Sequence, residues 1–203
     1  MTRDLHTALE ERLFRAVNVD LGPAADALAL VLSSRWTGIA VGLCLVAAFL
    51  LLGRRRRELG GALRLVAAIA LAVGLSDWLG YEVLKPLIGR MRPCYALQDI
   101  RWIAGGRDVG SLPSLHAANL TAMAVVALAA HRGLGIGALV LAAGVAWSRI
   151  YVGVHWPTDV LAGAAWGAAC AVAAIAITGR AAQMWAARRR RGRGSPVRGD
   201  PSP

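Results

Sequence analysis

The sequence is poor in lysine and cysteine, and it contains no spacing that is typical of a metal site. Its three cysteines are Cys44, Cys94 and Cys170, an odd number, and the first and last lie within apolar runs. A disulfide framework and a structural zinc site are therefore not expected. No cleavable apolar core follows a basic start, so a secretory signal peptide is not expected either.

Acidic residues are also scarce, with 12 against 23 basic residues and a formal net charge of +11. Much of the excess comes from the arginines at residues 54–57 and from the segment after Arg180. Because both stretches directly follow apolar runs, we assign them to a membrane surface rather than to nucleic acid. No nucleic-acid partner is expected, and no obligate protein partner is evident.

Apolar residues, by contrast, make up 57% of the chain, whereas about 45–50% is usual for a soluble domain. A membrane-spanning helix needs roughly 20 residues, and the abundance of alanine and glycine suits closely packed membrane helices. We predict an all-α, polytopic membrane helical bundle with about five transmembrane helices. The five apolar segments are residues 36–52, 62–81, 115–130, 134–147 and 160–177.

Arginine placement predicts the orientation of this bundle. Arginines follow the first, third and fifth segments, at residues 54–57, at Arg132 and at residues 188–191. The positive-inside rule places these three positions in the cytoplasm, so an odd number of spans leaves the N-terminus outside. The C-terminus is then cytoplasmic.

The N-terminal segment has an apolar residue at every fourth position. Leu5, Leu9, Leu13 and Val17 predict an amphipathic helix on the outer membrane surface; a flexible, partly helical arm is the alternative. We expect residues 1–35 to form an interfacial segment, 36–178 the transmembrane domain, and 179–203 a basic, disordered cytoplasmic tail.

The single lysine, Lys85, opens the run Lys-Pro-Leu-Ile-Gly-Arg-Met-Arg-Pro. Lys85 and Arg92 are two helical turns apart and share a face if the helix persists past Pro86, where a kink is expected. Long cationic side chains near a helix end can extend to the membrane interface, and this would explain the position of one or two of these cations. It would not explain why Arg92 and Arg149 both lie at the outer level beside histidines.

Pro-Ser-Leu-His, at residues 113–116, opens the third apolar segment. Ser114 suits the N-cap position, and a helix N-terminus presents backbone N–H groups that favour an anion. His116 then lies in the first turn, facing the same place. The alternative is a capping serine followed by an interfacial histidine.

His155 and Asp159 are four residues apart at the start of the fifth segment. A carboxylate at this distance can accept one imidazole N–H and leave the other nitrogen free to attack. Together with His116 they could instead form a two-histidine, one-carboxylate metal site. The cations Lys85 and Arg92 would repel a divalent ion, so neither a metal nor another cofactor is expected.

These three motifs, Lys-x6-Arg-Pro, Pro-Ser-x-His and Ser-Arg-x5-His-x3-Asp, resemble the signature of the type-2 phosphatidic acid phosphatase superfamily, which also includes vanadium-dependent haloperoxidases. The resemblance implies that His155 forms a phosphohistidine, that Asp159 orients it, and that His116 is the general acid and base. The groups implied to hold the phosphoryl oxygens are Lys85, Arg92, Ser114, Leu115 and Arg149. Leu115 departs from the family, which most often has glycine there; its backbone N–H remains available.

The resemblance implies a metal-independent lipid phosphatase at the outer face of a bacterial inner membrane, acting on a lipid phosphate or diphosphate. Undecaprenyl diphosphate is the favoured substrate, and phosphatidylglycerophosphate, phosphatidic acid and lipid A phosphate are the alternatives. A lipid phosphotransferase, a non-catalytic lipid-binding protein of the same fold and a haloperoxidase acting on a soluble substrate are the rival functions.

Overall fold

The computed structural model describes residues 5–52, 57–106 and 110–193, and all regular elements in these ranges are helical. In chain order they are α1 (Ala8–Val17), α2 (Pro23–Ser33), α3 (Arg35–Leu52), α4 (Arg57–Leu79), the π-helix η1 (Gly80–Leu84), α5 (Lys85–Ile88), α6 (Pro93–Ala96), α7 (Leu115–Ala130), α8 (Arg132–Tyr151) and α9 (Pro157–Arg193).

Local sequence signals explain where several helices begin and end. Thr7 caps α1 by accepting the backbone N–H of Glu10 at 3.2 Å, and Pro157 opens α9, where its missing N–H costs nothing. Gly89 adopts the left-handed conformation with φ 59°, which ends α5. His131 caps α8 through its ring nitrogen, which accepts from the backbone of Leu134.

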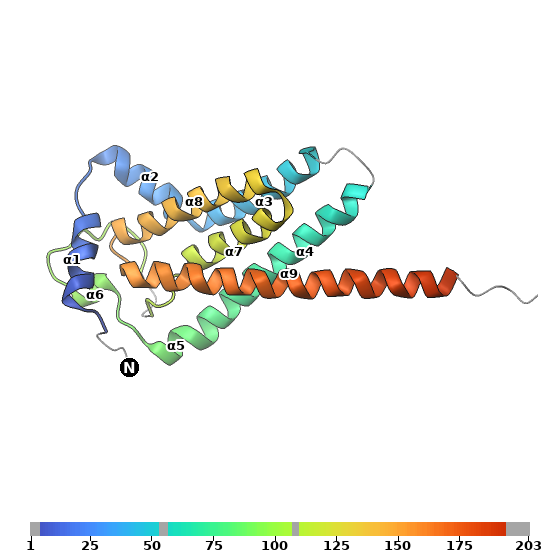
Figure 1. Ribbon diagram of the computed structural model, residues 1–203. Helices are drawn as coiled ribbons and strands as arrows, with labels where there is room; N and C mark the ends of the chain where they lie inside the picture. The colour runs from blue at the N-terminus through green and yellow to red at the C-terminus, as the bar shows by residue number, and fades with distance from the viewer. Residues whose placement is uncertain (1–4, 53–56, 107–109, 194–203) are drawn as a thin grey trace, which may run out of the picture.

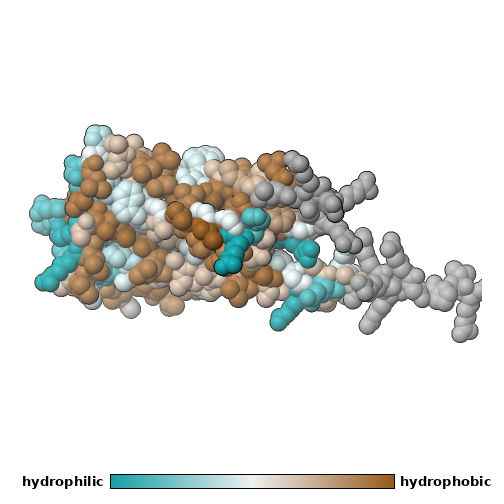
Figure 2. All heavy atoms as spheres, turned by 45° about the horizontal axis from the view of Figure 1, so that its top comes forward, coloured by the Kyte–Doolittle hydropathy of each residue, from teal (hydrophilic) through white to brown (hydrophobic). Residues whose placement is uncertain are grey.

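The long helices run alongside one another, with α7 packed against α4, α8 and α9 (Figure 1). The helices α1, α5 and α6 gather at one end of this bundle, together with the end of α8 and the start of α9 (Figure 1). Figure 2 shows apolar side chains along the flank of the bundle and polar ones at that same end. This confirms the predicted all-α bundle of membrane type.

The predicted number of five membrane spans is not confirmed. By length and composition, three described helical stretches can cross a membrane: Gly60–Ile88, Arg132–Tyr151 and Pro157–Ala186. A fourth is possible if α2 and α3, which meet at a bend of 66°, form one broken span. The helix α7 is present as predicted, but with 16 residues it is shorter than a usual span.

The N-terminal region contains two helices instead of the single amphipathic helix that was predicted. Two residues of the predicted apolar stripe face outward, since Leu9 is 67% exposed and Leu13 51% exposed, whereas Val17 packs against the core. The inward face buries Phe14, which packs with Trp156. Phe14 lies about a quarter of a turn from Leu13, so the four-residue spacing did not identify the ring that makes the main core contact.

Two close contacts between α9 and α7 join the helices that carry the histidine motifs. A Cβ at Gly163 would lie 2.4 Å from the carbonyl oxygen of Ser114, and one at Gly167 would lie 2.0 Å from that of Ala118. Small residues at such positions let helix backbones approach one another. The starts of both helices are thereby held together.

The prediction of a disordered tail from residue 179 is wrong over its first part. The helix α9 continues to Arg193, because the alanines, arginines and Gln183 beyond Gly179 are good helix formers. Residues 194–203 of the predicted tail, and the arginines at 54–56, lie outside the described residues.

Candidate active site

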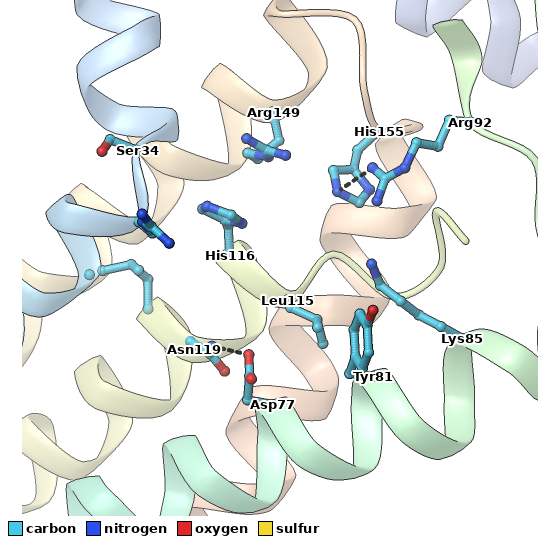
Figure 3. Close-up of a pocket in the computed structure, with 13 residues that line it drawn as sticks. Ser34, Asp77, Tyr81, Lys85, Arg92, Leu115, His116, Asn119, Arg149 and His155 are labelled. Atoms are coloured by element: carbon cyan, nitrogen blue, oxygen red, sulfur yellow. Dashed lines mark hydrogen bonds between the residues drawn. The ribbon is translucent and has the colours of Figure 1, made fainter. Parts of the chain in front are cut away.

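A cavity of about 480 Å³ opens at the polar end of the bundle, and six of the eight predicted site residues line it (Figure 3). These six are Lys85, Arg92, Leu115, His116, Arg149 and His155. The other two, Ser114 and Asp159, are fully buried. The three motifs, which are spread over 75 positions of sequence, therefore meet around one pocket.

Lys85 and Arg92 reach the pocket by a different route from the one considered in the sequence. The helix does not persist to Arg92, because α5 ends at Ile88 and the chain turns at Gly89. Arg92 follows in extended conformation, immediately before Pro93 opens α6. Both cations still line the pocket. The turn at Gly89, and not a continuous helix face, brings them together.

Arg149, in the last turn of α8, reaches the junction between α2 and α3. Its Nη1 donates to the Ser33 hydroxyl at 2.6 Å and lies 3.3 Å from the Ser33 carbonyl oxygen. Its side chain is buried beside the pocket. The bend between α2 and α3 is thus fixed to a cation of the pocket wall.

His155 lies between a carboxylate and a guanidinium. Its Nδ1 is 3.3 Å from Asp159 Oδ2, and its Nε2 is 3.1 Å from Arg92 Nη1. Asp159 Oδ2 also accepts the backbone N–H of Trp156 at 2.9 Å, which fixes the carboxylate. An Nδ1–H donated to Asp159 leaves the lone pair of Nε2 on the side of the pocket cations.

Burial and the neighbouring Arg92 charge lower the pKa of His155 well below its ordinary value of 6.5. Charges on Arg149 and Lys85 act in the same direction. Both effects disfavour the imidazolium. His155 is therefore neutral at physiological pH, which is the form that can attack an electrophile.

His116 is the second residue of α7, and it enters the pocket below Arg149 (Figure 3). Ser114 occupies the N-cap position, as predicted, but its hydroxyl makes no capping bond. Within the described part of the chain that buried hydroxyl has no hydrogen-bond partner. The Ser114 N–H donates to the Asp159 carbonyl at 3.0 Å, which ties the start of α7 to α9.

The alternative metal site finds no support in this geometry. Among the described residues, no group of three His, Cys, Asp or Glu side chains is arranged to hold a metal ion. Asp159 lies behind His155, where its second carboxylate oxygen pairs with Arg90 at 2.8 Å. The pocket is lined instead by several cations, among them Lys85, Arg92 and Arg149, and by the carboxylate of Asp77.

A sequence model of the PAP2 superfamily matches residues 61–183, which include all three motifs. The chain belongs to the PAP2 superfamily. Lipid A 4'-phosphatase of Bacteroides thetaiotaomicron is 33% identical over 138 residues, 64% of this chain and 61% of that protein. Undecaprenyl-diphosphatase of Sulfolobus acidocaldarius is 34% identical over 119 residues, 58% of this chain and 54% of that protein. The chain thus spans less than two thirds of either relative.

Two solved PAP2 structures share this fold. LpxE of Aquifex aeolicus superimposes with a TM-score of 0.67 at 25% identity, covering 86% of this chain and 99% of that one. The transmembrane phosphatidylglycerolphosphate phosphatase of PAP2 type from Bacillus subtilis gives 0.63 at 23% identity, covering 86% and 89%. The second likeness concerns the fold alone.

The departure at Leu115 has a structural counterpart in this PAP2 chain. A Cβ at Gly80 would lie 2.4 Å from Leu115 Cδ2, so the missing side chain of Gly80 makes room for the leucine. Gly80 begins the π-helix that precedes Lys85. The contact between Gly80 and Leu115 therefore joins two walls of the pocket. No spacing rule in the sequence indicates this contact.

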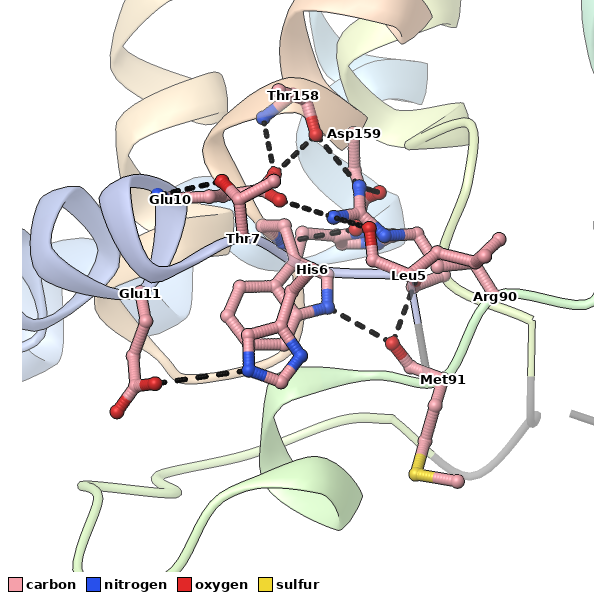
Figure 4. Close-up of polar contacts among 12 residues, drawn as sticks. Leu5, His6, Thr7, Glu10, Glu11, Arg90, Met91, Thr158 and Asp159 are labelled. Atoms are coloured by element: carbon pink, nitrogen blue, oxygen red, sulfur yellow. Dashed lines mark hydrogen bonds and ion pairs between the residues drawn. The ribbon is translucent and has the colours of Figure 1, made fainter. Parts of the chain in front are cut away.

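Sequence reasoning missed several residues of the PAP2 site. Arg35, at the start of α3, lines the pocket, and Asp77 accepts a hydrogen bond from Asn119 at its floor at 2.9 Å. Arg90 and Glu10 form a buried ion pair behind Asp159 (Figure 4). Arg90 lies inside the lysine motif and could have been singled out; Glu10 carries no signal in the sequence.

Proposed function

We propose that this PAP2 protein is a lipid phosphatase that transfers a phosphoryl group from a lipid phosphate or diphosphate to His155. The observation that carries this proposal is the arrangement of His155, whose imidazole is neutral, backed by Asp159 and directed at a pocket lined by Lys85, Arg92 and Arg149. Phosphoryl transfer depends mainly on positioning and on neutralising the charge of the equatorial oxygens.

The reaction takes two balanced steps. Nε2 of His155 attacks phosphorus and the bond from phosphorus to the leaving oxygen breaks. His116, protonated when the negative charge of the bound phosphate offsets the surrounding cations, gives its proton to that oxygen. His116 then takes a proton from water, which attacks the phosphohistidine and releases inorganic phosphate while His155 regains its lone pair. Arg92, which faces Nε2 at 3.1 Å, would donate to the phosphoryl oxygens, and the buried Ser114 hydroxyl adds a further donor.

An apolar groove supports a lipid as the substrate. It has a volume of about 550 Å³, is lined by α3, α4 and α7, and shares Arg35, Gly38 and Asn119 with the pocket. A ligand that lies in both would carry charge at one end and hydrocarbon at the other. This is the form of a phosphorylated lipid.

Arg35 favours a diphosphate substrate. It lines both the cationic pocket and the apolar groove, where the phosphate next to the lipid tail would lie when the terminal phosphate faces His155. We therefore favour an isoprenyl diphosphate such as undecaprenyl diphosphate. Arg35→Gln should raise KM for the diphosphate on the order of tenfold and for a lipid monophosphate much less, as expected for loss of one charged contact; equal effects on both would argue against this choice.

The orientation follows from charge. The start of α8, at Arg132, and the arginine-rich end of α9 lie at the end of the bundle opposite α1 and α6 (Figure 1). The positive-inside rule assigns that end to the cytoplasm. We propose an integral protein of a bacterial inner membrane whose site faces outward. Residues 1–35 then belong to the outer interface, 36–178 to the membrane domain, and the remainder to the cytoplasmic side.

The test is phosphate release by the purified protein in detergent with EDTA present. Undecaprenyl diphosphate, phosphatidylglycerophosphate, phosphatidic acid and lipid A would be offered in parallel. His155→Ala should abolish release without unfolding the protein, while the control His131→Asn, at the far end of the bundle, should retain it because asparagine can also cap α8. Release that persists in His155→Ala, or requires an added lipid acceptor, would refute the hydrolase proposal.

A further inference from the structure

We propose that Arg90 and Glu10 position the catalytic carboxylate, so that the N-terminal helix α1 is a working part of the active site. The inference rests on the proposed function of His155 and concerns residues outside the three motifs. Asp159 has two carboxylate oxygens with separate tasks. Oδ2 faces His155 Nδ1 at 3.3 Å, and Oδ1 accepts from Arg90 Nη1 at 2.8 Å.

Arg90 is itself held through both terminal nitrogens of its guanidinium (Figure 4). Its Nη2 pairs with Glu10 Oε2, and its Nη1 lies 2.6 Å from the Thr158 hydroxyl. The guanidinium carbon lies 5.5 Å from the centre of the Trp156 ring. A planar guanidinium can bridge two carboxylates in a fixed geometry, which a lysine cannot do.

Glu10 closes the network from α1. Besides Arg90 it accepts the backbone N–H of Thr158 at 3.2 Å and the Thr158 hydroxyl. Thr158 immediately precedes Asp159 in the first turn of α9. Glu10 therefore fixes both the cation that holds Asp159 and the backbone that carries it.

Burial makes the charge balance of this network decisive. Glu10 is 6% exposed, Arg90 4% and Asp159 0%, so one guanidinium serves two buried carboxylates. Removing Arg90 from such a network leaves buried carboxylates without a compensating charge. Asp159 would then lose the charge that favours its ionised form, and a protonated Asp159 stabilises a developing positive charge on His155 poorly.

Helix α1 lies outside the segment by which the chain is assigned to its superfamily. The superfamily model matches residues 61–183, and Glu10 is not among them. Apolar packing holds α1 in place independently of Glu10, because Phe14 and Val17 join a cluster with Trp156 and Ile150. Altering the Glu10 carboxylate should therefore leave α1 docked and change only the electrostatics.

The test compares kcat, KM and thermal stability in detergent for matched variants. Arg90→Met should lower kcat on the order of 10- to 100-fold, the loss expected for one charge-assisted hydrogen bond, with KM nearly unchanged. Arg90→Lys should recover part of this loss. Glu10→Gln should lower kcat about fivefold, whereas Glu11→Gln, the same change one residue on at a surface pair with Arg15, should have no effect.

The double variant Arg90→Met with Glu10→Gln separates positioning from stability. It removes the second buried carboxylate, so the melting temperature should recover towards that of the wild type while kcat stays low. Recovery of kcat together with stability would overturn the proposal, because the network would then be structural only. Equal kcat for Glu10→Gln and Glu11→Gln would exclude Glu10 from it.

Nitrogen-15 NMR of the labelled histidines gives a readout that does not depend on turnover. The His155 signals, assigned by their loss in His155→Gln, should show the Nδ1–H tautomer in the wild type and a shifted, exchange-broadened Nδ1 signal in Arg90→Met. Unchanged signals would overturn the positioning role even if no lipid is hydrolysed. If the wild type shows no turnover but Arg90→Met shows the expected NMR change, the proposed phosphatase activity is rejected and the positioning role stands.

Discussion

Gly167→Ala should impair both folding and activity, because α9 and α7 touch through their backbones at this point. The added Cβ would lie 2.0 Å from the Ala118 carbonyl oxygen and 2.7 Å from its carbon, whereas real contacts of this kind essentially never fall below 3.0 Å. The helices must therefore separate by about 1 Å locally. Backbone atoms cannot turn aside as a flexible side chain can.

The size of the effect follows from that displacement. Overpacking of this kind typically costs about 1–3 kcal/mol of stability. Since α7 carries Ser114 and His116 and α9 carries Asp159, separating the helices also moves the two halves of the site. A misplacement of about 1 Å can lower a rate roughly 100-fold.

The control is Gly179→Ala on the same helix, where an added Cβ meets nothing within 4 Å. Alanine is the better helix former by roughly 0.5–1 kcal/mol, so this variant should be at least as stable as the wild type. The assay is thermal unfolding in detergent, together with kcat for phosphate release. A Gly167→Ala protein as stable and as active as Gly179→Ala would refute the proposed role of this contact.

Three further predictions concern the pocket. Arg149→Lys should lower kcat/KM at least tenfold, since lysine cannot reproduce the planar fork; steady-state kinetics within twofold of the wild type would contradict this. The pKa of His155 is lowered by burial and by Arg92, so below about pH 6.5 the unfolded chain binds a proton that the folded chain does not. The melting temperature should therefore decrease as the pH is lowered below this value. His155→Asn should make the melting temperature less dependent on pH. Gly80→Ala should displace Leu115 and raise KM, and adding Leu115→Gly should relieve the effect.

The sequence predicted the parts of the site that depend on short spacings. His155 and Asp159 meet across the start of α9, because Pro157 opens that helix between them and its first turn brings the carboxylate back to the imidazole. The positions of arginines and histidines at the ends of apolar segments predicted that the three motifs lie at the same end of the bundle. These inferences needed only periodicity and helix-capping rules.

Long-range pairing could not be predicted in the same way. Glu10 meets Arg90 across 80 positions, and no local pattern distinguishes it from the more exposed Glu11 beside it. The bend of 66° between α2 and α3 also adjoins a tertiary contact, the one from Arg149 to Ser33. Such features arise from how helices pack, so a single sequence carries little signal for them.

The helix α9 spans 37 residues without interruption, a length of about 55 Å at 1.5 Å per residue. The hydrocarbon layer of a membrane is only about 30 Å thick. In the proposed orientation, which puts Asp159 at one surface, the last turns of this helix would stand well clear of the opposite one. One rigid rod would thus hold the arginine-rich end at a set distance from the lipid headgroups, as a fixed spacer between the membrane and whatever lies beyond it.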